Sequence, residues 1–303
     1  MFQNPHCKGQ IGLLEKSLIR IILSGLLIMG MLLFPVAASA NGLCDTPITS
    51  NLTLTANLHC PDGDGLVIGA DGIKVDLGGF TVSGEGMIGT AGIRVHGFQH
   101  VTIMNGTVLG FDIGVVIETN PDTSRTASAM VSNIHATGNL SYGFLTTSQP
   151  GILPSTSTLI NNIASYNGYV GIYFDKGTFT ASRNNSYNNG REGIVAHGSS
   201  GTLDRDRAFN NAFSGVSVRD ADDVGTIHHG VLEANGVRSH HNGLAGFEIG
   251  GGADAMLVGS RALHNGGPGY ACSSANSTSG SGNLAVGNAG GSTDGACSFL
   301  TIP

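Results

Sequence analysis

The sequence predicts an all-β solenoid, in which short coils of about 22 residues stack with their polar faces outward. Three observations lead to this prediction. A glycine-containing phrase recurs along most of the chain, the residues after it alternate between apolar and polar, and no stretch keeps a helical period. The composition agrees, because 48 of the 303 residues are glycine and Trp is absent, unlike an ordinary globular domain.

The recurring phrase is Asn-Gly-x-x-Gly-Ile, intact at residues 167–172 and 189–194 and diverged at 211–216, 242–247 and 265–270. Its second glycine, here called the anchor glycine, recurs every 22 to 31 residues. One unit therefore has about 22 residues, and three units carry insertions. The anchor glycines are Gly92, Gly114, Gly143, Gly171, Gly193, Gly215, Gly246 and Gly269.

Within a unit the pattern is that of short strands. Apolar Ile172 and Phe174 alternate with Tyr173 and Asp175, and turn residues follow. Three strands of about four residues, joined by Gly, Asn and Asp turns, fill one unit. Because such a unit cannot bury its apolar side chains alone, neighbouring units must stack.

These repeats resemble those of the pectate-lyase-like superfamily over about residues 65–300, and residues 52–61 followed by 72–79 are similar to the first coil of its secreted bacterial members. The resemblance implies a single-stranded right-handed parallel β-helix of about nine to ten coils over residues 65–303, preceded by an N-terminal cap at 41–64. The superfamily includes lyases, hydrolases, epimerases, adhesins and proteins of no known activity, so it predicts fold far better than function.

The resemblance also implies a tight turn after the second strand of each coil, often occupied by Asn. Asn105, Asn133 and Asn161 fit this turn, whereas Arg183 and Arg205 replace Asn in two later coils. Stacked Asn side chains can pair their amides along the axis. We expect such a ladder at this turn to be broken.

Residues 1–40 have the three-part pattern of a secretory signal peptide, and we expect cleavage after Ala40. Lys8, Lys16 and Arg20 precede an apolar run at residues 21–34. A membrane anchor is the rival interpretation, but this run is short for a bilayer span and nothing comparable follows. We therefore expect a secreted, periplasmic or cell-surface protein with no membrane span after signal cleavage.

Four cysteines lie beyond residue 40, Cys44 and Cys60 near the start of that part and Cys272 and Cys297 near its end. An even number after an export signal predicts two disulfides. Pairing within each end would staple the termini, where a stacked fold frays most easily. Metal ligation is the alternative, but no Cys-x-x-Cys spacing occurs.

Beyond residue 40 the chain carries 11 Lys and Arg against 20 Asp and Glu, a formal charge of −9. Nucleic acid and anionic membranes are poor partners for such a chain. No phosphate-cradling glycine run and no nicotinamide fingerprint occurs, so we expect no nucleotide cofactor.

Stacking turns sequence spacing into lateral contact, because residues at equal offsets from the anchor glycine become neighbours about 4.8 Å apart. Asp175, His197 and Arg219 share one offset on three successive coils, with Tyr173 beside Asp175, and by alternation they point outward. A carboxylate orients an imidazole, and an arginine can hold a sugar carboxylate. We predict an acid/base and anion-binding set. The alternative is that these residues are ordinary charges on a solvent-exposed sheet face, where opposite charges lie on adjacent strands.

In related lyases and uronate epimerases the substrate groove runs along this same outer face, so the resemblance points to the same residues, although no catalytic motif of the family is matched. Further side chains at the two outward offsets are candidates for substrate binding. Insertions around residues 118–128, 146–157 and 220–226 would project from one turn and form walls beside the face. The substrate-binding candidates are Arg94, His96, Glu118 and Glu248.

Asp220, Asp222 and Asp223 lie in the last insertion and form a candidate Ca²⁺ site, because Ca²⁺ takes several oxygen ligands. Turn chemistry is the simpler explanation for an Asp-rich loop. The histidine pairs at 228–229 and 240–241 are not expected to chelate an ion jointly, since adjacent strand residues point to opposite faces.

The function predicted from these residues is the binding of a polysaccharide or cell-surface glycan, with or without lyase-type or epimerase-type modification. The alternative is a non-catalytic surface, structural or adhesive protein that uses its coils as a rigid scaffold.

Overall fold

The computed structural model describes residues 42–223, 225–295, 297–298 and 301–302, and the predicted signal peptide lies outside them. In these ranges the regular elements are strands, and no helix there has the length and apolar character of a membrane span. The all-β prediction is confirmed.

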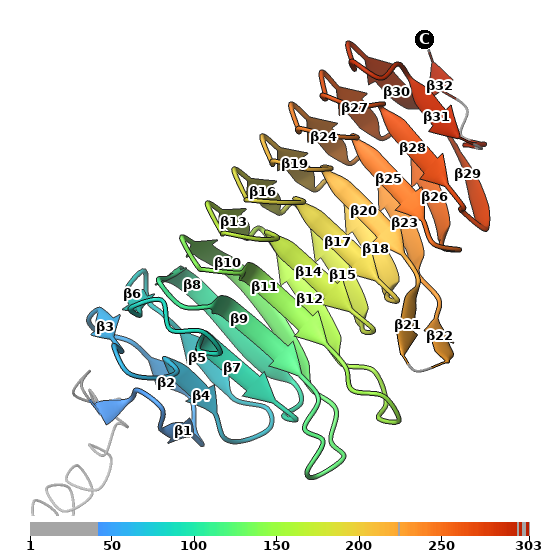
Figure 1. Ribbon diagram of the computed structural model, residues 1–303. Coiled ribbons are helices and arrows are strands. Elements are labelled where there is room, and N and C mark those ends of the chain that lie inside the picture. Colours follow the sequence, from blue (N-terminus) through green and yellow to red (C-terminus); the bar gives the residue numbers. More distant parts are fainter. Residues whose placement is uncertain (1–41, 224, 296, 299–300, 303) are drawn as a thin grey trace, which may run out of the picture. The chain divides into compact units, whose positions relative to one another are not determined.

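The first sheet contains eleven parallel strands among the described residues, and each strand after β1 is hydrogen-bonded to the strand one coil earlier (Figure 1). Ten of them lie within residues 65–303, and β1 lies in the segment predicted to be the cap. The strands are β1 (Pro47–Ile48), β4 (Leu66–Ile68), β7 (Ala91–His96), β9 (Ile113–Glu118), β11 (Tyr142–Thr147), β14 (Ile172–Asp175), β17 (Ile194–His197), β20 (Val216–Arg219), β25 (Phe247–Gly250), β28 (Tyr270–Ser273) and β31 (Thr293–Gly295).

The second strand of each coil forms another parallel stack beside the first. Two of its strands, β8 and β10, are long enough to run on into the third stack. The second stack comprises β2 (Leu52–Thr53), β5 (Lys74–Asp76), β8 (Val101–Leu109), β10 (Ser128–Thr137), β12 (Thr156–Ile160), β15 (Thr178–Ser182), β18 (Ser200–Asp204), β23 (Val231–Asn235), β26 (Asp254–Val258) and β29 (Ser277–Ser281).

The third strand of each coil completes the repeat, again in parallel register. One antiparallel hairpin, β21 (Ala221–Asp223) with β22 (Thr226–His228), interrupts a coil between its first and second strands. The remaining strands of the third stack are β3 (Leu58–His59), β6 (Thr81–Ser83), β13 (Ile163–Ser165), β16 (Asn185–Tyr187), β19 (Arg207–Phe209), β24 (Arg238–His240), β27 (Arg261–Leu263), β30 (Asn283–Val286) and β32 (Thr301–Ile302).

The anchor glycines mark equivalent points of consecutive coils, as predicted. They are glycine because the backbone of the next coil comes too close for a side chain. A Cβ on Gly193 would lie 2.7 Å from the carbonyl oxygen of Gly215 and 2.9 Å from the Cβ of Ala208. The φ angle of Gly193 is not in the left-handed region, so coil-to-coil packing alone excludes a side chain here.

A continuous ladder of buried asparagines runs beside the anchor glycines, and the sequence analysis did not predict it. Asn189 donates its backbone N–H and its Nδ2 to Oδ1 of Asn211, at 3.2 Å and 2.9 Å. Its Nδ2 also donates to the carbonyl of Ala164 at 3.2 Å, so the amide is fully used. The ladder comprises Asn139, Asn167, Asn189, Asn211, Asn242, Asn265 and Asn288.

The turn that was expected to hold an interrupted Asn ladder does so. Asn105, Asn133, Asn161, Arg183 and Arg205 all have φ between 54° and 59°, the left-handed conformation that Asn tolerates well. Only one amide pair forms among them in the described part of the chain, from Asn133 Nδ2 to Asn105 Oδ1 at 3.3 Å.

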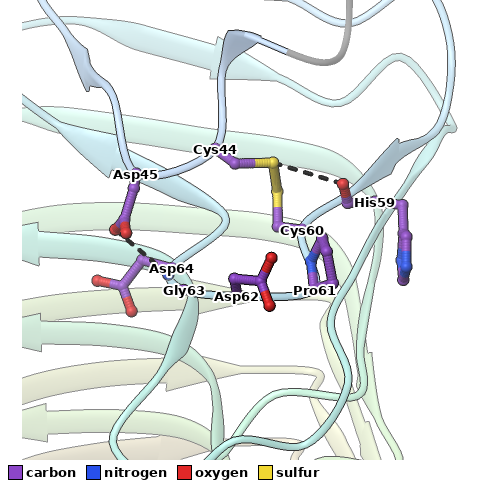
Figure 2. A pocket seen from close by; sticks show the side chains of 8 residues that line it. All are labelled: Cys44, Asp45, His59, Cys60, Pro61, Asp62, Gly63 and Asp64. Atoms are coloured by element: carbon purple, nitrogen blue, oxygen red, sulfur yellow. Dashed lines mark hydrogen bonds between the residues drawn. A yellow bond between two sulfur atoms is a disulfide. The ribbon is translucent and has the colours of Figure 1, made fainter.

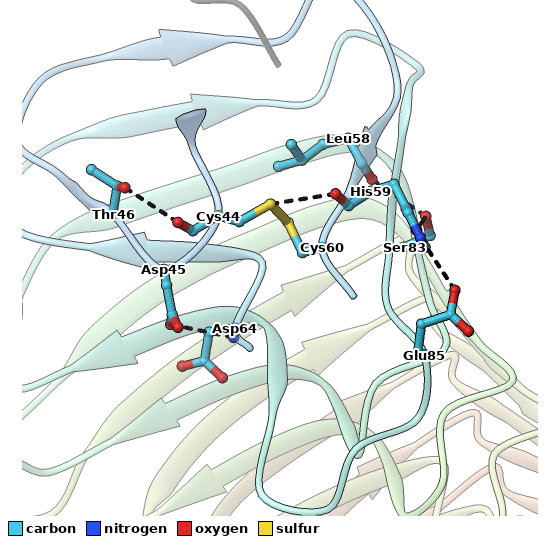
Figure 3. Close-up of a disulfide and its surroundings, with 9 residues drawn as sticks. All are labelled: Cys44, Asp45, Thr46, Leu58, His59, Cys60, Asp64, Ser83 and Glu85. Carbon is cyan, nitrogen blue, oxygen red and sulfur yellow. Dashed lines mark hydrogen bonds and ion pairs between the residues drawn. A yellow bond between two sulfur atoms is a disulfide. The ribbon is translucent and has the colours of Figure 1, made fainter. Parts of the chain in front are cut away.

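Both predicted disulfides are present, Cys44 to Cys60 and Cys272 to Cys297, with Cα–Cα distances of 5.6 Å and 5.2 Å. Figure 3 shows the first of them beside His59, which attaches its coil to the next. His59 Nδ1 contacts Ser83 Oγ at 3.1 Å and its Nε2 contacts Glu85 at 3.2 Å.

A second buried ladder contains an acid in place of an amide. Asn184 donates its N–H and its Nδ2 to Asp206 Oδ1 at 2.7 Å and 2.8 Å. Asn184 also donates its Nδ2 to the carbonyl of Leu159. Asp206 has an oxygen, Oδ2, instead of that amide nitrogen, and this atom is buried without a hydrogen-bond partner among the described residues. Burial raises the pKa of Asp206 to about 7, although the bonds from Asn184 oppose the shift.

We predict that Asp206→Asn removes a pH dependence of folding stability. Because the pKa of Asp206 is raised in the folded state, its contribution is complete below the unfolded pKa near 3.8 and is lost as pH rises towards about 7. The difference between the unfolded pKa of 3.8 and the folded pKa of about 7 corresponds to at most about 4 kcal/mol of unfolding free energy. Urea unfolding at about pH 4 and about pH 8 measures it.

The variant should gain stability over the wild type at the higher pH and little at the lower. Asp122→Asn, in an exposed loop, is the matched control and should keep the wild-type profile. Identical pH profiles for Asp206→Asn and the wild type would show that Asp206 is not a buried neutral acid.

Candidate functional site

The residues predicted to carry chemistry form a cluster on the outer face of the first sheet. Asp175 pairs in register with His197, and His197 pairs with Arg219, on β14, β17 and β20. His197 Nδ1 lies 3.0 Å from Asp175 Oδ1 and 3.0 Å from the hydroxyl of Tyr173. We call Tyr173, Asp175, His197 and Arg219 the central cluster.

Asp175 is ionised in this setting. Its burial alone would raise its pKa, but the hydrogen bond from His197 and the charge of Lys176 outweigh burial and hold the pKa below its ordinary value. Lys176 Nζ lies 3.5 Å from Asp175 Oδ2, and Thr147 Oγ1 donates to the same oxygen at 3.1 Å. In the neutral tautomer of His197 that donates from Nδ1 to Asp175, the lone pair is on Nε2, which has no hydrogen-bond partner among the described residues.

Tyr173 keeps its proton. Burial raises the pKa of its hydroxyl, and the negative charge of Asp175 raises it further. Its ring stacks on Tyr142 with centroids 5.3 Å apart. Tyr173 is therefore present as the phenol, the form that a proton donor must have.

Arg219 is paired with a buried acid that the sequence analysis missed. Its Nη2 lies 3.6 Å from Oε1 of Glu192, which is only 3% exposed. Glu192 precedes the anchor glycine of β17, whereas Arg219 ends β20, so the pair spans the width of the sheet. Outward-facing Val195 and Ser217, between them, are buried, so this face is a packed layer.

An aromatic flank borders the central cluster at the start of the first-sheet strands. Arg191 lies over the rings of Tyr169 and Phe213, at 4.6 Å and 4.8 Å, and Tyr142 meets Tyr169 edge-on at 5.5 Å. Tyr169 and Phe213 are about one-third exposed. These residues occupy the variable positions just before the anchor glycines, and those positions are also neighbours on successive coils. Comparing them from repeat to repeat would have predicted the flank from the sequence.

Two to four coils before Asp175, Asp64, Arg94, His96 and Glu118 form an N-terminal cluster on the same face. Arg94 pairs through Nε and Nη2 with Asp64, through Nη1 with Glu118 at 2.6 Å, and donates to the Gly89 carbonyl at 2.9 Å. His96 Nδ1 lies 3.2 Å from the same Glu118 oxygen. The guanidinium of Arg94 is thus committed to protein partners, and these acids raise its pKa although burial opposes the shift.

Solved structures show which fold this is. The A-module of mannuronan C-5 epimerase AlgE6 of Azotobacter vinelandii matches with a TM-score of 0.53 and 13% identity over 84% of this chain and 91% of that chain. The A-module of mannuronan C-5 epimerase AlgE4 of the same organism matches with a TM-score of 0.53 and 16% identity, over 84% of this chain and 89% of that chain. Tailspike protein 2 of Escherichia coli O157:H7 bacteriophage CAB120 matches with a TM-score of 0.51 and 15% identity, over 85% of this chain and 37% of that chain.

The chain is a right-handed parallel β-helix. No protein-family model matches it, and neither does any curated protein. At identities of 13% to 16% the likeness of this β-helix to the solved structures establishes the fold alone, and the β-helix spans little more than a third of the tailspike. The superfamily resemblance is confirmed at that level.

The three insertions of the β-helix leave from the same turn, between the first and second strands of their coils (Figure 1). They occupy residues 119–127, 148–155 and 220–230, the last of which contains the β21–β22 hairpin. Glu248, the fourth substrate-binding candidate, accepts a hydrogen bond from Ser214 Oγ at 2.8 Å. It lies two coils beyond Val195, in register with Ser217.

The three aspartates of the candidate Ca²⁺ site contact different neighbours in the structure. Asp220 pairs with His229 at 3.0 Å, Asp223 pairs with Lys176 at 2.9 Å, and Asp222 accepts a turn amide from Gly225 at 3.1 Å. Each carboxylate is used by a different neighbour, and the described residues contain no group of three His, Cys, Asp or Glu that could hold a metal ion. The amide that Asp222 accepts is typical of ordinary turn chemistry, the alternative interpretation of this loop.

A cavity of about 500 Å³ lies at the first coil of the β-helix (Figure 2). Asp64 lines it and belongs also to the N-terminal cluster. The full lining is Cys44, Asp45, His59, Cys60, Pro61, Asp62, Gly63 and Asp64.

We predict that Arg94→Gln destabilises the β-helix by about 3 kcal/mol, because it leaves two largely buried carboxylates without their cation. Arg125→Gln is the matched control. Arg125 pairs with Asp71 in an exposed setting, and its loss should cost less than about 1 kcal/mol. Urea unfolding of both variants measures the difference, and equal losses would show that the N-terminal cluster does not stabilise the fold.

Proposed function

We propose that this β-helix binds an acidic extracellular polysaccharide along the outer face of its first sheet and modifies it at the central cluster. The observation that carries the proposal is the shared position of His197 Nδ1 between Asp175 and Tyr173, which leaves Nε2 available as a base. A lyase or an epimerase of uronate units is the reaction type that fits.

In such a reaction His197 Nε2 removes the proton beside the uronate carboxylate, and the electron pair of the broken C–H bond moves into that carboxylate. The charge of Arg219 stabilises the electron-rich intermediate. In a lyase the pair then forms a C=C bond, the neighbouring C–O bond breaks, and Tyr173 supplies the proton to the leaving oxygen. In an epimerase the same carbon instead takes the hydroxyl proton of Tyr173 on the opposite face of the sugar.

Two further considerations support a glycan partner. The structural neighbours include proteins named as mannuronan C-5 epimerases. The two disulfides are typical of an oxidising compartment, which agrees with the proposed signal peptide at residues 1–40 and with a secreted, periplasmic or cell-surface location.

A second candidate function is a non-catalytic surface or adhesive scaffold. One observation favours it: Glu192 already neutralises Arg219, and Val195 and Ser217 are buried between them. Under this alternative the central cluster is a structural layer that binds glycans or partners without altering them.

We predict that the wild-type protein converts polymannuronate, alginate or polygalacturonate but not neutral dextran. His197→Gln and Tyr173→Phe should each lower the rate at least roughly 100-fold, the usual contribution of an acid or base. Ultraviolet absorbance of unsaturated ends reports a lyase, and proton NMR of the polymer reports an epimerase. His100→Gln is the control and should keep full activity, because His100 is exposed and lies in the turn before β8.

If the wild type binds these polymers yet leaves them unchanged, the scaffold alternative replaces the enzymatic one. If conversion occurs but survives His197→Gln, the chemistry lies elsewhere on the molecule.

A further inference from the structure

A column of arginines lies on the outer face of the third stack, away from the first sheet. Arg207, Arg238 and Arg261 begin β19, β24 and β27 and pair in direct register (Figure 1). All three side chains are exposed. With coils about 4.8 Å apart, the column places three cations along a line of about 10 Å.

The charge of this arginine column is uncompensated. Among the described residues every Lys and Arg beyond residue 40 forms an ion pair with Asp or Glu, except the arginine column and nearby Arg183. The five strands of this face, β16, β19, β24, β27 and β30, contain no acidic residue. Like charges directly opposite on neighbouring strands repel each other, so the column costs stability unless an anion binds to it.

A ring column runs parallel to the arginine column on β16, β19 and β24, two of which also carry an arginine of that column. Tyr187, Phe209 and His240 pair in register, with ring centroids 4.8 Å and 5.0 Å apart in stacked orientation. The guanidinium of Arg207 lies 5.7 Å from the Phe209 ring. The face therefore offers rings beside cations at the repeat of the coils.

The positive charge of this face acts on a neighbouring histidine. Burial lowers the pKa of His240, and the positive charges of His241, Arg207 and Arg238 lower it further. His241 Nδ1 lies 3.0 Å from His240 Nδ1, so the expectation that this pair points to opposite faces is wrong. The reason is the φ of 55° at His241, which ends the strand and breaks its alternation.

We propose that this face binds a linear anionic polysaccharide laid along the coil axis, with its carboxylate or sulfate groups on the arginine column and its sugar rings against the ring column. One cation per coil suits a polymer with an acid group at each sugar, and the planar guanidinium pairs well with carboxylate or sulfate. Nucleic acid fits less well, because the rest of the chain is negatively charged and would repel a polyanion as thick as a duplex. This surface is independent of the central cluster.

The test is a gel-shift titration of the mature protein with heparin and with polygalacturonate across a range of salt concentrations. Arg207→Gln combined with Arg238→Gln should weaken binding about tenfold and flatten its salt dependence. Lys74→Gln combined with Arg125→Gln changes the net charge equally at ion-paired sites elsewhere and should leave binding unchanged. His197→Gln should also bind like the wild type, which separates this surface from the proposed catalytic site.

Thermal unfolding provides a second readout. Because the first double variant relieves repulsion between stacked cations, it should unfold at the same or a higher temperature than the wild type. Equal weakening by both double variants would show that only net charge matters and would overturn the proposal. Equal binding of neutral dextran, or tighter binding of single-stranded DNA than of either polysaccharide, would also overturn it.

Discussion

The contact between the backbones of successive coils at the anchor glycines sets the register of the whole molecule. At Gly193 the carbonyl of Gly215 and the amide of Asn211 come within 2.7 Å and 2.6 Å of the position that a Cβ would take. A side chain there would push the coils apart, and the packed interior cannot absorb that change. Every lateral neighbourhood described above, including the central cluster and the arginine column, depends on this register.

The buried Asn ladder reinforces the same register with polar contacts. Each amide satisfies the backbone of the preceding coil as well as its own neighbour, so a slip by one residue would leave buried donors and acceptors unpaired. The first Asn of the recurring phrase and its second glycine therefore act together: the glycine admits the next coil and the Asn binds it. This explains why both residues recur while the three positions between them vary.

Much of the fold followed from the sequence because the repeat is short and its glycine is nearly invariant. The register placed Asp175, His197 and Arg219 in one column correctly, since strand pairing alone decides which Cα atoms are neighbours. Side-chain reach was not predictable in the same way. Arg219 extends back across the sheet to Glu192, and the three loop aspartates each contact a different partner. The position of a residue relative to the anchor glycine does not determine where a long side chain ends or which loop amide it meets. His241 was misjudged since a single left-handed residue breaks the alternation of a strand.

The most direct measurement of the central claim is the free energy of unfolding of Gly193→Ala, compared with Gly42→Ala, where the added methyl meets no atom within 4 Å. If coil-to-coil backbone contact sets the register, Gly193→Ala loses about 3 kcal/mol and Gly42→Ala loses little. A Gly193→Ala variant as stable as the wild type would contradict the account, because the coils would then have room that the structure denies them.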